Sequence, residues 1–396
     1  MSETDSSRYG ARGVSASKSD VHKAVDKLDK GLFPYAFCKI TADPFSGDSE
    51  RCSVIHADGS GTKSILAYLH YRETGDVSVF EGIAQDSIVM NLDDLLCVGA
   101  HKGIMLSSTI NRNSHRCDGD VIAALIQGNE KFIQTMRDFD IDIINGGGET
   151  ADMGDVIRTI SVDTCAVATM KRSEVIGDGI KPNLVIVGLA SHGKSVYETF
   201  ENSGIGSNGL TSARHEMLSS HYRETYPEAY DPEIDSSLVY CGPYRMQDAL
   251  PGSSLKVGEA LLSPTRTYAP MVVPLMKEKP GLMKALIHCS GGAQTKCLRF
   301  GLGVHFIKDD LFDVPPLFSE IQKHSGTTTA EMYKVYNMGH RMEVYVEPDD
   351  VPEVLSRAKA LELDAKVIGR TEESKREDKA SHLTLRANGE ELSYQL

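Results

Sequence analysis

Hydrophobic positions along the chain predict helices and strands interspersed from one end to the other. Apolar residues recur at helical spacing over 15–30, 80–98 and 119–138, which predicts three amphipathic helices. Apolar and polar residues alternate over 139–144 and 157–169, which predicts strands. Short apolar runs predict further strands at 54–55, 184–189, 285–289, 342–347 and 365–369. This mixture indicates the α/β (or α+β) class.

A change of composition divides the chain. The stretch 177–183 is rich in Gly, Pro and Asp and comes just before a new apolar strand, so it is a candidate domain boundary. We therefore expect one domain over 1–180 and a second over 181–370. Residues 371–396 are expected to form a charged tail or a hairpin that turns at Asn388-Gly389.

Composition excludes several classes of protein. The chain has 396 residues, of which 40% are hydrophobic and 25% charged, as in ordinary globular proteins. It has neither a run of about twenty apolar residues nor the apolar core of a signal peptide near its start, so we expect a cytoplasmic protein. A net charge of −14 argues against general binding to nucleic acid or anionic membranes. The eight cysteines form no C-x-x-C pair, which favours reduced thiols over disulfides or a zinc site.

The segment Asp58-Gly59-Ser60-Gly61-Thr62-Lys63 combines several groups that bind phosphates. Its carboxylate is a candidate Mg²⁺ ligand, its glycines expose N–H groups and its lysine supplies a cation. The segment is not a Walker A loop, because G-x-x-x-x-G-K-[ST] is absent. Taken alone, it is equally consistent with an ordinary turn.

Two further segments carry carboxylates in unusual surroundings. The helix over 80–98 places Asp86, Asp93 and Asp94 near one face, where they bind a cation or form a solvent-facing stripe. Gly146-Gly147-Gly148 follows the strand over 139–144 and leads to Glu149 and Asp152. This segment is either a close approach to a ligand or a flexible hairpin loop. Two weaker glycine loops lie at 206–209 and 290–293.

The chemical inventory favours Mg²⁺-nucleotide chemistry. Acidic loops at strand ends occur together with glycine turns, whereas a histidine–cysteine cluster typical of zinc is absent from the sequence pattern. A G-x-S-x-G elbow is missing, and so is a G-x-G-x-x-G that opens a helix, so a serine hydrolase and a dinucleotide-binding fold lack support.

The order of the motifs is more specific than any one of them. D-G-x-G-T-K at 58–63 is followed by the acidic helix ending in Asp-Asp-Leu at 93–95, G-G-E-T-A at 147–151, S-N-G at 207–209 and S-P-T-R-x-Y at 263–268. Segments 9–14, 287–292 and 331–339 complete the series. Over residues 9–370 this order resembles the phosphoribosylformylglycinamidine cyclo-ligase (AIR synthetase) family.

The resemblance implies a two-domain fold and a reaction. The N-terminal sheet would form a homodimer interface, and the C-terminal domain would be an α/β sandwich. ATP and Mg²⁺ would drive ring closure of formylglycinamidine ribonucleotide to aminoimidazole ribonucleotide in purine biosynthesis, through a phosphorylated imidate. The substrate would be a phosphorylated ribonucleotide, and neither nucleic acid nor membrane would be a partner.

The resemblance also implies roles for individual residues. The Mg²⁺ ligands would be Asp58, Asp94 and Glu149, with Asp86 and Asp93 in reserve. The catalytic residues would be Asp94, Lys63 and Asn208. Nucleotide contacts would come from Asp58, Gly59, Gly61, Thr62, Lys63, Gly147, Gly148 and Thr150. Substrate contacts would come from Ser207, Asn208, Gly209, Thr265, Arg266, Ser290, Gly291 and Gly292.

Some positions depart from the family pattern. Gly206 stands where many relatives carry a histidine, Asp93 replaces an asparagine and Asp152 replaces a glutamate. The segment 31–35 replaces a glycine-rich N-terminal loop. Two alternatives therefore stay open: another ATP-using member of the superfamily, such as a selenophosphate synthetase-like protein or a small-molecule kinase, and a non-catalytic nucleotide-binding protein.

Overall fold

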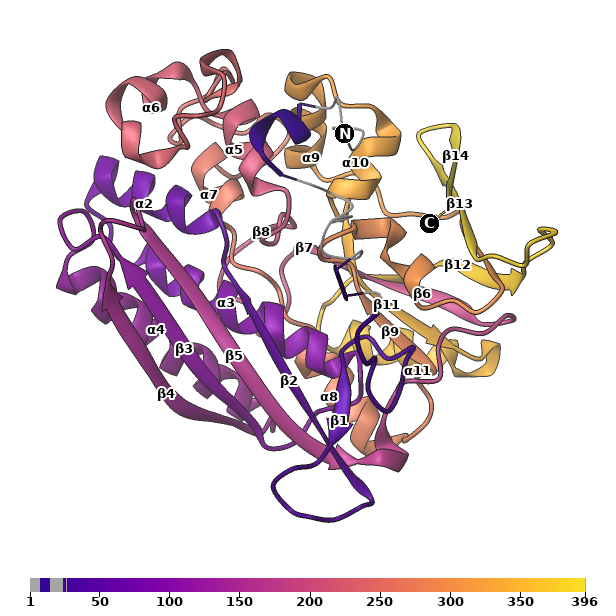
Figure 1. Cartoon of the computed structure of the whole chain (residues 1–396). Coiled ribbons are helices and arrows are strands. Elements are labelled where there is room, and N and C mark those ends of the chain that lie inside the picture. Colours follow the sequence, from indigo (N-terminus) through magenta and orange to yellow (C-terminus); the bar gives the residue numbers. More distant parts are fainter. Residues whose placement is uncertain (1–7, 15–23, 26, 396) are drawn as a thin grey trace.

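Two large β-sheets, each covered by helices, make up most of the molecule (Figure 1). The computed structural model describes residues 8–14, 24, 25 and 27–395, so most of the helix expected over 15–30 lies outside the described residues. Within these ranges, no helix is both long enough and apolar enough to span a bilayer. The α/β class expected from the sequence is confirmed.

The first sheet has five strands in the order β1-β2-β5-β3-β4. Only β3 and β4 run parallel to each other. Three helices, α2 (Lys63–Thr74), α3 (Val79–Leu96) and α4 (Gly119–Asp138), accompany this sheet. Buried and half-buried residues alternate along β5, as the pattern over 157–169 predicts, because one face packs on the helices. The strands are β1 (Ile40–Ala42), β2 (Arg51–Gly59), β3 (Ile104–Arg112), β4 (Ile143–Asp152) and β5 (Ile160–Lys171).

Helix α3 lies between the two sheets and is buried along nearly its whole length. Asp86, Asp93 and Asp94 are all buried on it, so a solvent-facing charged stripe is excluded. Carboxylates in the interior require hydrogen-bonding or charged partners. The partners of these three therefore define the chemistry of the region between the sheets.

The second sheet has seven strands in the order β14-β13-β10-β12-β6-β11-β9. Every residue of β11 is buried, because apolar clusters cover both faces of the sheet. Helices α8 (Ala269–Glu278) and α11 (Val351–Ala360) belong to one cluster, and α5 (Leu210–Met217), α7 (Val257–Leu262), α9 (Pro316–Ser325) and α10 (Thr329–Val335) to the other. The strands are β6 (Val185–Ala190), β9 (Ala285–His288), β10 (Val304–Lys308), β11 (His340–Val346), β12 (Ala365–Glu373), β13 (His382–Ala387) and β14 (Glu390–Gln395).

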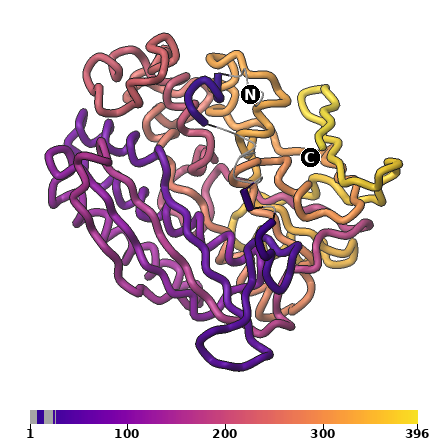
Figure 2. Tube along the Cα trace, in the orientation of Figure 1, coloured from indigo at the N-terminus to yellow at the C-terminus, as the bar shows by residue number. Residues whose placement is uncertain are grey.

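The remaining elements are short or lie at the edges. Between α5 and α7 come α6 (Ser220–Thr225) and two 3₁₀ turns, and β7 (His192–Gly193) pairs with β8 (Asn202–Ser203). The hairpin β13–β14 turns at Asn388-Gly389 and joins the second sheet beside β10. Near the start of the chain, Arg12 donates to Ser212 and Glu216 of α5, so the N-terminal segment lies against the second half of the molecule (Figure 2).

The strand expected over 139–144 was placed wrongly. Residues 139–142 form the turn after α4, and β4 begins at Ile143 and continues through the triple glycine. A Cβ at Gly146 would lie 2.8 Å from the carbonyl oxygen of Leu106, and one at Gly148 would lie 2.1 Å from that of Ser108. These glycines therefore permit close pairing with β3, and the flexible hairpin loop is excluded.

Candidate active site between the two sheets

Three buried side chains of α3 face the second half of the chain at successive helical turns. Asp86, Met90 and Asp94 are four residues apart, so they share one side of the helix. Asp86 contacts Thr265, Met90 contacts Arg341 and Asp94 contacts His288, and Asp86 also contacts Lys63 of the first half. This row of contacts forms the centre of the candidate site.

The first contact is a closed ion pair. Lys63 Nζ donates to Asp86 Oδ1 at 2.8 Å and to the carbonyl oxygen of Ser263 at 2.5 Å. The same carboxylate oxygen accepts from the N–H and the hydroxyl of Thr265. Burial lowers the pKa of Lys63, although Asp86 opposes this shift. The geometry gives Lys63 and Asp86 a positioning role that joins the start of α2 and α3 to the S-P-T-R segment; their phosphate and metal roles stay predictions.

The Asp94 carboxylate is surrounded by cations and imidazoles. His288 Nδ1 lies 2.5 Å from Asp94 Oδ1, and His56 Nε2 lies 3.3 Å from Asp94 Oδ2. Burial acts to raise the pKa of Asp94, but Lys296, His288 and His56 outweigh it and lower that pKa to about 2. The carboxylate is therefore ionised and already engaged on both oxygens.

His288 is arranged as a neutral, oriented imidazole. Burial and the positive charge of Arg341 lower its pKa to about 4. With Nδ1 donating to Asp94, Nε2 keeps its lone pair. Among the described residues, Nε2 has no hydrogen-bond partner although it is buried. A neutral imidazole held by a carboxylate, with its other nitrogen available, is suited to accept a proton.

Asp93 belongs to a different environment from its neighbour. It accepts a hydrogen bond of 2.6 Å from the Thr267 hydroxyl, next to the N-terminus of α8. Burial raises the pKa of Asp93 to about 7. Its hydrogen bonds go to Thr267 and Tyr268 and not to the partners of Asp94, and its reserve role in metal binding stays a prediction.

Asp58 and Glu149 lie far apart in one chain. Gly59 pairs with Asp163, Asp163 with Thr109 and Thr109 with Glu149, so these residues form one row across four strands. At strand spacings of about 4.8 Å, roughly 14 Å separate the two ends of the row. Glu149 and Asp58, which precedes Gly59, are both exposed and are too far apart to share an ion within one chain.

Asp163 lies in the middle of this row. A Cβ on Gly59 would meet its carboxylate at 2.1 Å. The alternation along β5 marks Asp163 as a residue of the outer face, so sequence analysis had a signal for this acid and missed it.

Other nucleotide-binding candidates surround this row. Thr62 precedes α2, and its hydroxyl lies 3.0 Å from that of Thr211 on α5. Gly61 and Gly147 both have positive φ and open space where a side chain would be. The N–H of Thr150 donates to Glu149 Oε1. These contacts leave the predicted nucleotide roles untested.

The substrate-binding candidates fall into two groups. The hydrogen-bonding groups of Arg266 are all engaged. Its guanidinium donates to both oxygens of Glu198 and to the carbonyl oxygens of Ala190, His192 and Gly193. Thr265 is likewise engaged by Asp86. Both are thus fixed within the scaffold, and a direct role in substrate binding stays a prediction.

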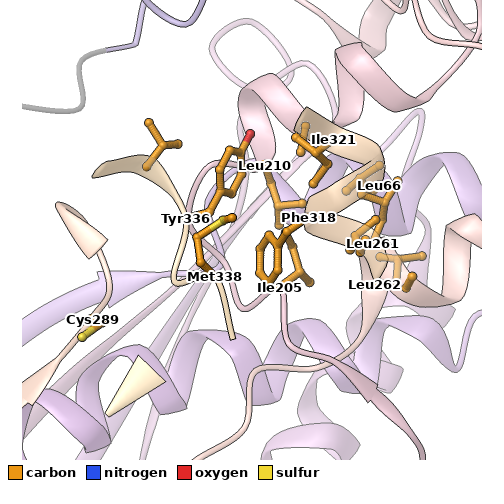
Figure 3. Packing of buried hydrophobic residues seen from close by; sticks show 14 of the residues in the cluster. Leu66, Ile205, Leu210, Leu261, Leu262, Cys289, Phe318, Ile321, Tyr336 and Met338 are labelled. Atoms are coloured by element: carbon orange, nitrogen blue, oxygen red, sulfur yellow. The ribbon is translucent and has the colours of Figure 1, made fainter. Parts of the chain in front are cut away.

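The second group forms two glycine-containing loops. Ser207 Oγ lies 3.1 Å from Thr265 Oγ1, and Asn208 Oδ1 is buried without a partner in the described part of the chain. Gly209 has positive φ and lies against the ring of Tyr336. Ile205 and Leu210, on either side of the first loop, pack in the same apolar cluster as Tyr336 and Met338 (Figure 3). In the second loop, Ser290 Oγ accepts from Lys296 Nζ at 2.6 Å, and Gly291 and Gly292 follow it.

Sequence reasoning assigned no role to His56, His288, Lys296 or Arg341. His288 lies inside the family-like segment 287–292 and was therefore within reach. Lys296 and Arg341 are brought to the site only by the packing of the second sheet and its connections, so the local pattern gave no signal for them.

One buried cluster outside this site resembles a metal centre. Ligand atoms of Cys289, His340 and Glu343 lie within 4.8 Å of one another. However, the ammonium group of Lys308 donates to Glu343 there. A cation is already in place, so we interpret the cluster as a closed ion pair.

Comparisons with known proteins agree with this architecture. The model for the N-terminal domain of AIR synthase related proteins matches residues 40–170, and the model for their C-terminal domain matches 181–379. A phosphoribosylformylglycinamidine cyclo-ligase of Methanocaldococcus jannaschii is 29% identical over 81% of this chain and 78% of its own length. The chloroplastic cyclo-ligase of Arabidopsis thaliana is 28% identical over 99% of this chain and 84% of its own.

Solved structures are similar in fold. Thermotoga maritima PurL complexed with FGAR has a TM-score of 0.51 at 12% identity, over 89% of this chain and 48% of that one. A chain of the HypE–HypF complex has a TM-score of 0.51 at 14% identity, over 96% and 99%. The two domain models match in order and together cover most of the sequence, so the chain belongs to the family of AIR synthase related proteins.

Proposed function

We propose that this protein is a cyclo-ligase that converts formylglycinamidine ribonucleotide to aminoimidazole ribonucleotide with ATP. One observation carries the proposal: three family motifs that are far apart in sequence, at 58–63, 263–268 and 287–292, meet at α3 through the contacts of Lys63 and Thr265 with Asp86 and of His288 with Asp94. Curated relatives named as this cyclo-ligase support it. The cytoplasmic location expected from the sequence stays a prediction.

The chemistry needs alignment and one proton acceptor. The formyl amide oxygen attacks the γ-phosphorus of ATP, forming a phosphorylated imidate and releasing ADP. The amidine nitrogen then attacks the imidate carbon, the C–O bond breaks and phosphate leaves. Closing the aromatic ring removes a proton, for which His288 Nε2 is the proposed acceptor, and Asp94 holds its imidazole in position. Asn208, in the opposite loop, is proposed to orient the substrate.

Exposed carboxylates of the first sheet fit a Mg²⁺ requirement. Magnesium binds through one or two carboxylates together with phosphate oxygens, and Asp163 and Glu149 offer carboxylate oxygens on the outer face of the first sheet, with Asp58 at the exposed end of β2. When bound there, the ion would neutralise charge on the ATP phosphates.

A homodimer through the first sheet is part of the proposal. Ile55 pairs with Val167, Val167 with Met105 and Met105 with Ile144, which makes one apolar row across four strands. Three of these side chains are 42–66% exposed on the face away from the helices. A contiguous exposed apolar row is typical of an interface. A second copy would cover this row and bring the row that contains Asp163 and Glu149 close to the same row of the other copy.

The decisive experiment follows product formation with purified protein, ATP, Mg²⁺ and formylglycinamidine ribonucleotide. We expect aminoimidazole ribonucleotide and ADP in equal amounts. His288→Asn should lower kcat by roughly 10²–10⁴-fold, as for loss of a general base. The control, His324→Asn on the surface of α9, should leave kcat unchanged.

Two outcomes would count against the proposal. Near-normal kcat in the His288 variant would remove that residue from the mechanism. ATP hydrolysis with a different small nucleophile, and no aminoimidazole ribonucleotide, would point to another activity within the superfamily.

A further inference from the structure

Arg341 on β11 carries a buried positive charge that forms no ion pair within the described ranges of the chain. The residue is 1% exposed, and its Nη2 donates only to the thioether sulfur of Met90, at 3.0 Å. Nη1 is buried without a hydrogen-bond partner among the described residues. Within the same part of the chain, the guanidinium forms no ion pair with a carboxylate.

Such an arrangement is costly unless a ligand completes it. Removing a guanidinium from water carries a large desolvation penalty, which natural structures offset with a carboxylate, several carbonyl oxygens or a bound anion. Arg266, buried to a similar degree, shows the usual solution, because Glu198 and three carbonyl oxygens surround it. Arg341 has none of these acceptors among the described residues.

The charged groups near Arg341 supply no carboxylate that forms an ion pair with it in the described part of the chain. Lys63 and His288 both feel the positive charge of Arg341, which acts to lower the pKa of each. Asp86 is held by Lys63, Asp94 by His288 and Asp93 by Thr267. Each of these acids has another donor, while Asp86 Oδ2 is buried without a hydrogen-bond partner in the described part of the chain and Arg341 acts to lower the pKa of Asp93 against the effect of burial.

The turn at Gly206 makes room for the guanidinium. A Cβ at Gly206 would lie 2.9 Å from Arg341 Nε and 3.1 Å from Cζ, and φ there is +66°. A larger side chain at position 206 and the observed position of Arg341 exclude each other.

Arg341 also lies beside other groups that have no partner. Its contact residue Met90 and the Asp94 that holds His288 are one turn apart on α3, about 6 Å along the axis. His288 Nε2 and Asn208 Oδ1 are both buried and unpartnered within the described ranges. These unpartnered groups come from β9, β11 and the 206–209 loop, the elements that border the proposed site.

We propose that Arg341 binds a phosphoryl group. The planar fork of a guanidinium donates two parallel hydrogen bonds to a tetrahedral oxyanion, which fits the role better than a point charge does. This inference rests on the proposed function for its ligand: the group is either the ribose phosphate of the substrate or the phosphoryl group supplied by ATP. Because the side chain is covered, entry of the anion requires movement of a covering segment.

The first test separates ligand binding from a structural role. Arg341→Met removes a charge that has no partner, so its Tm should equal or exceed that of the wild type. The matched control, Arg266→Met, leaves Glu198 buried and unpaired and should lower Tm. An equal loss of Tm in both variants would overturn the proposal, since Arg341 would then be a structural residue.

The second test measures equilibrium binding of ribose 5-phosphate and of ATP with Mg²⁺ to the wild type, Arg341→Met and Arg341→Lys. We expect Arg341→Met to bind one of these ligands at least tenfold more weakly, with partial recovery in Arg341→Lys. Weaker binding of ribose 5-phosphate would identify the ligand of Arg341 as the ribose phosphate of the substrate. Weaker binding of ATP would identify it as the phosphoryl group that ATP supplies. Unchanged binding of both would overturn the inference. Arg341-dependent binding without cyclo-ligase activity would instead sink only the proposed reaction.

Discussion

At the scale of single residues, buried ionisable groups divide into paired and unpaired ones. The pair formed by Lys308 and Glu343 is fully buried, with Tyr345 also donating to the carboxylate. Burial acts to raise the pKa of Glu343, but Lys308 and His340 lower it to about 2. Such a pair supports the stability of the fold only while both partners are present, because removing one partner leaves the other as an uncompensated buried charge.

Glu343→Gln should therefore destabilise the protein in a pH-dependent way. The folded-state pKa lies below the unfolded value of about 4.3, so the stability that Glu343 contributes is present above that pH and is lost as pH falls toward 2. At pH 7 we expect the variant to lose about 3–5 kcal/mol in urea unfolding, with the difference shrinking below pH 4. Glu372→Gln, which removes an exposed pair with Arg370, should cost less than about 1 kcal/mol. A loss that is the same at pH 3 and pH 7 would contradict an ionised Glu343.

At the scale of elements, β4 shows how glycine can build a strand. Gly148 faces a carbonyl oxygen of β3 at a distance that leaves no room for a methyl group. Gly148→Ala should push β4 from its partner and cost about 1–3 kcal/mol in chemical denaturation, as overpacking does. Gly119→Ala on α4, where a Cβ meets open space, is the control and should change stability little. Equal small effects of both substitutions would restore the flexible-loop interpretation.

The sequence predicted the long, strongly periodic elements well. Helices over 80–98 and 119–138 and the strand over 157–169 correspond to α3, α4 and β5 within two or three residues. It missed β3 and α2, since β3 mixes serine and threonine with apolar residues and α2 has a weak apolar face. The order of motifs identified the family. Partners such as Lys63 with Asp86 or His288 with Asp94 could not be predicted, because they join residues 23 and 194 positions apart.

At the scale of the whole molecule, the apolar row Ile55–Val167–Met105–Ile144 predicts self-association. Met105→Glu places charge in the middle of this row and should convert a dimer to a monomer in sedimentation equilibrium, because a buried carboxylate without a partner is costly. Ile126→Glu changes a residue that is equally exposed but lies on α4, and it should leave the dimer intact. A wild-type protein that sediments as a monomer would refute the proposed dimer.

The burial of α3 has a consequence for how the chain is divided. Two family models recognise two domains in sequence, yet each of the two apolar clusters draws residues from both. Neither of the two domains recognised in sequence has a hydrophobic core built from its own residues alone. A cut between β5 and β6 would expose the interior of each fragment rather than release two finished modules. The boundary is thus one of sequence, and we expect the two matched ranges, 40–170 and 181–379, to fold as one unit.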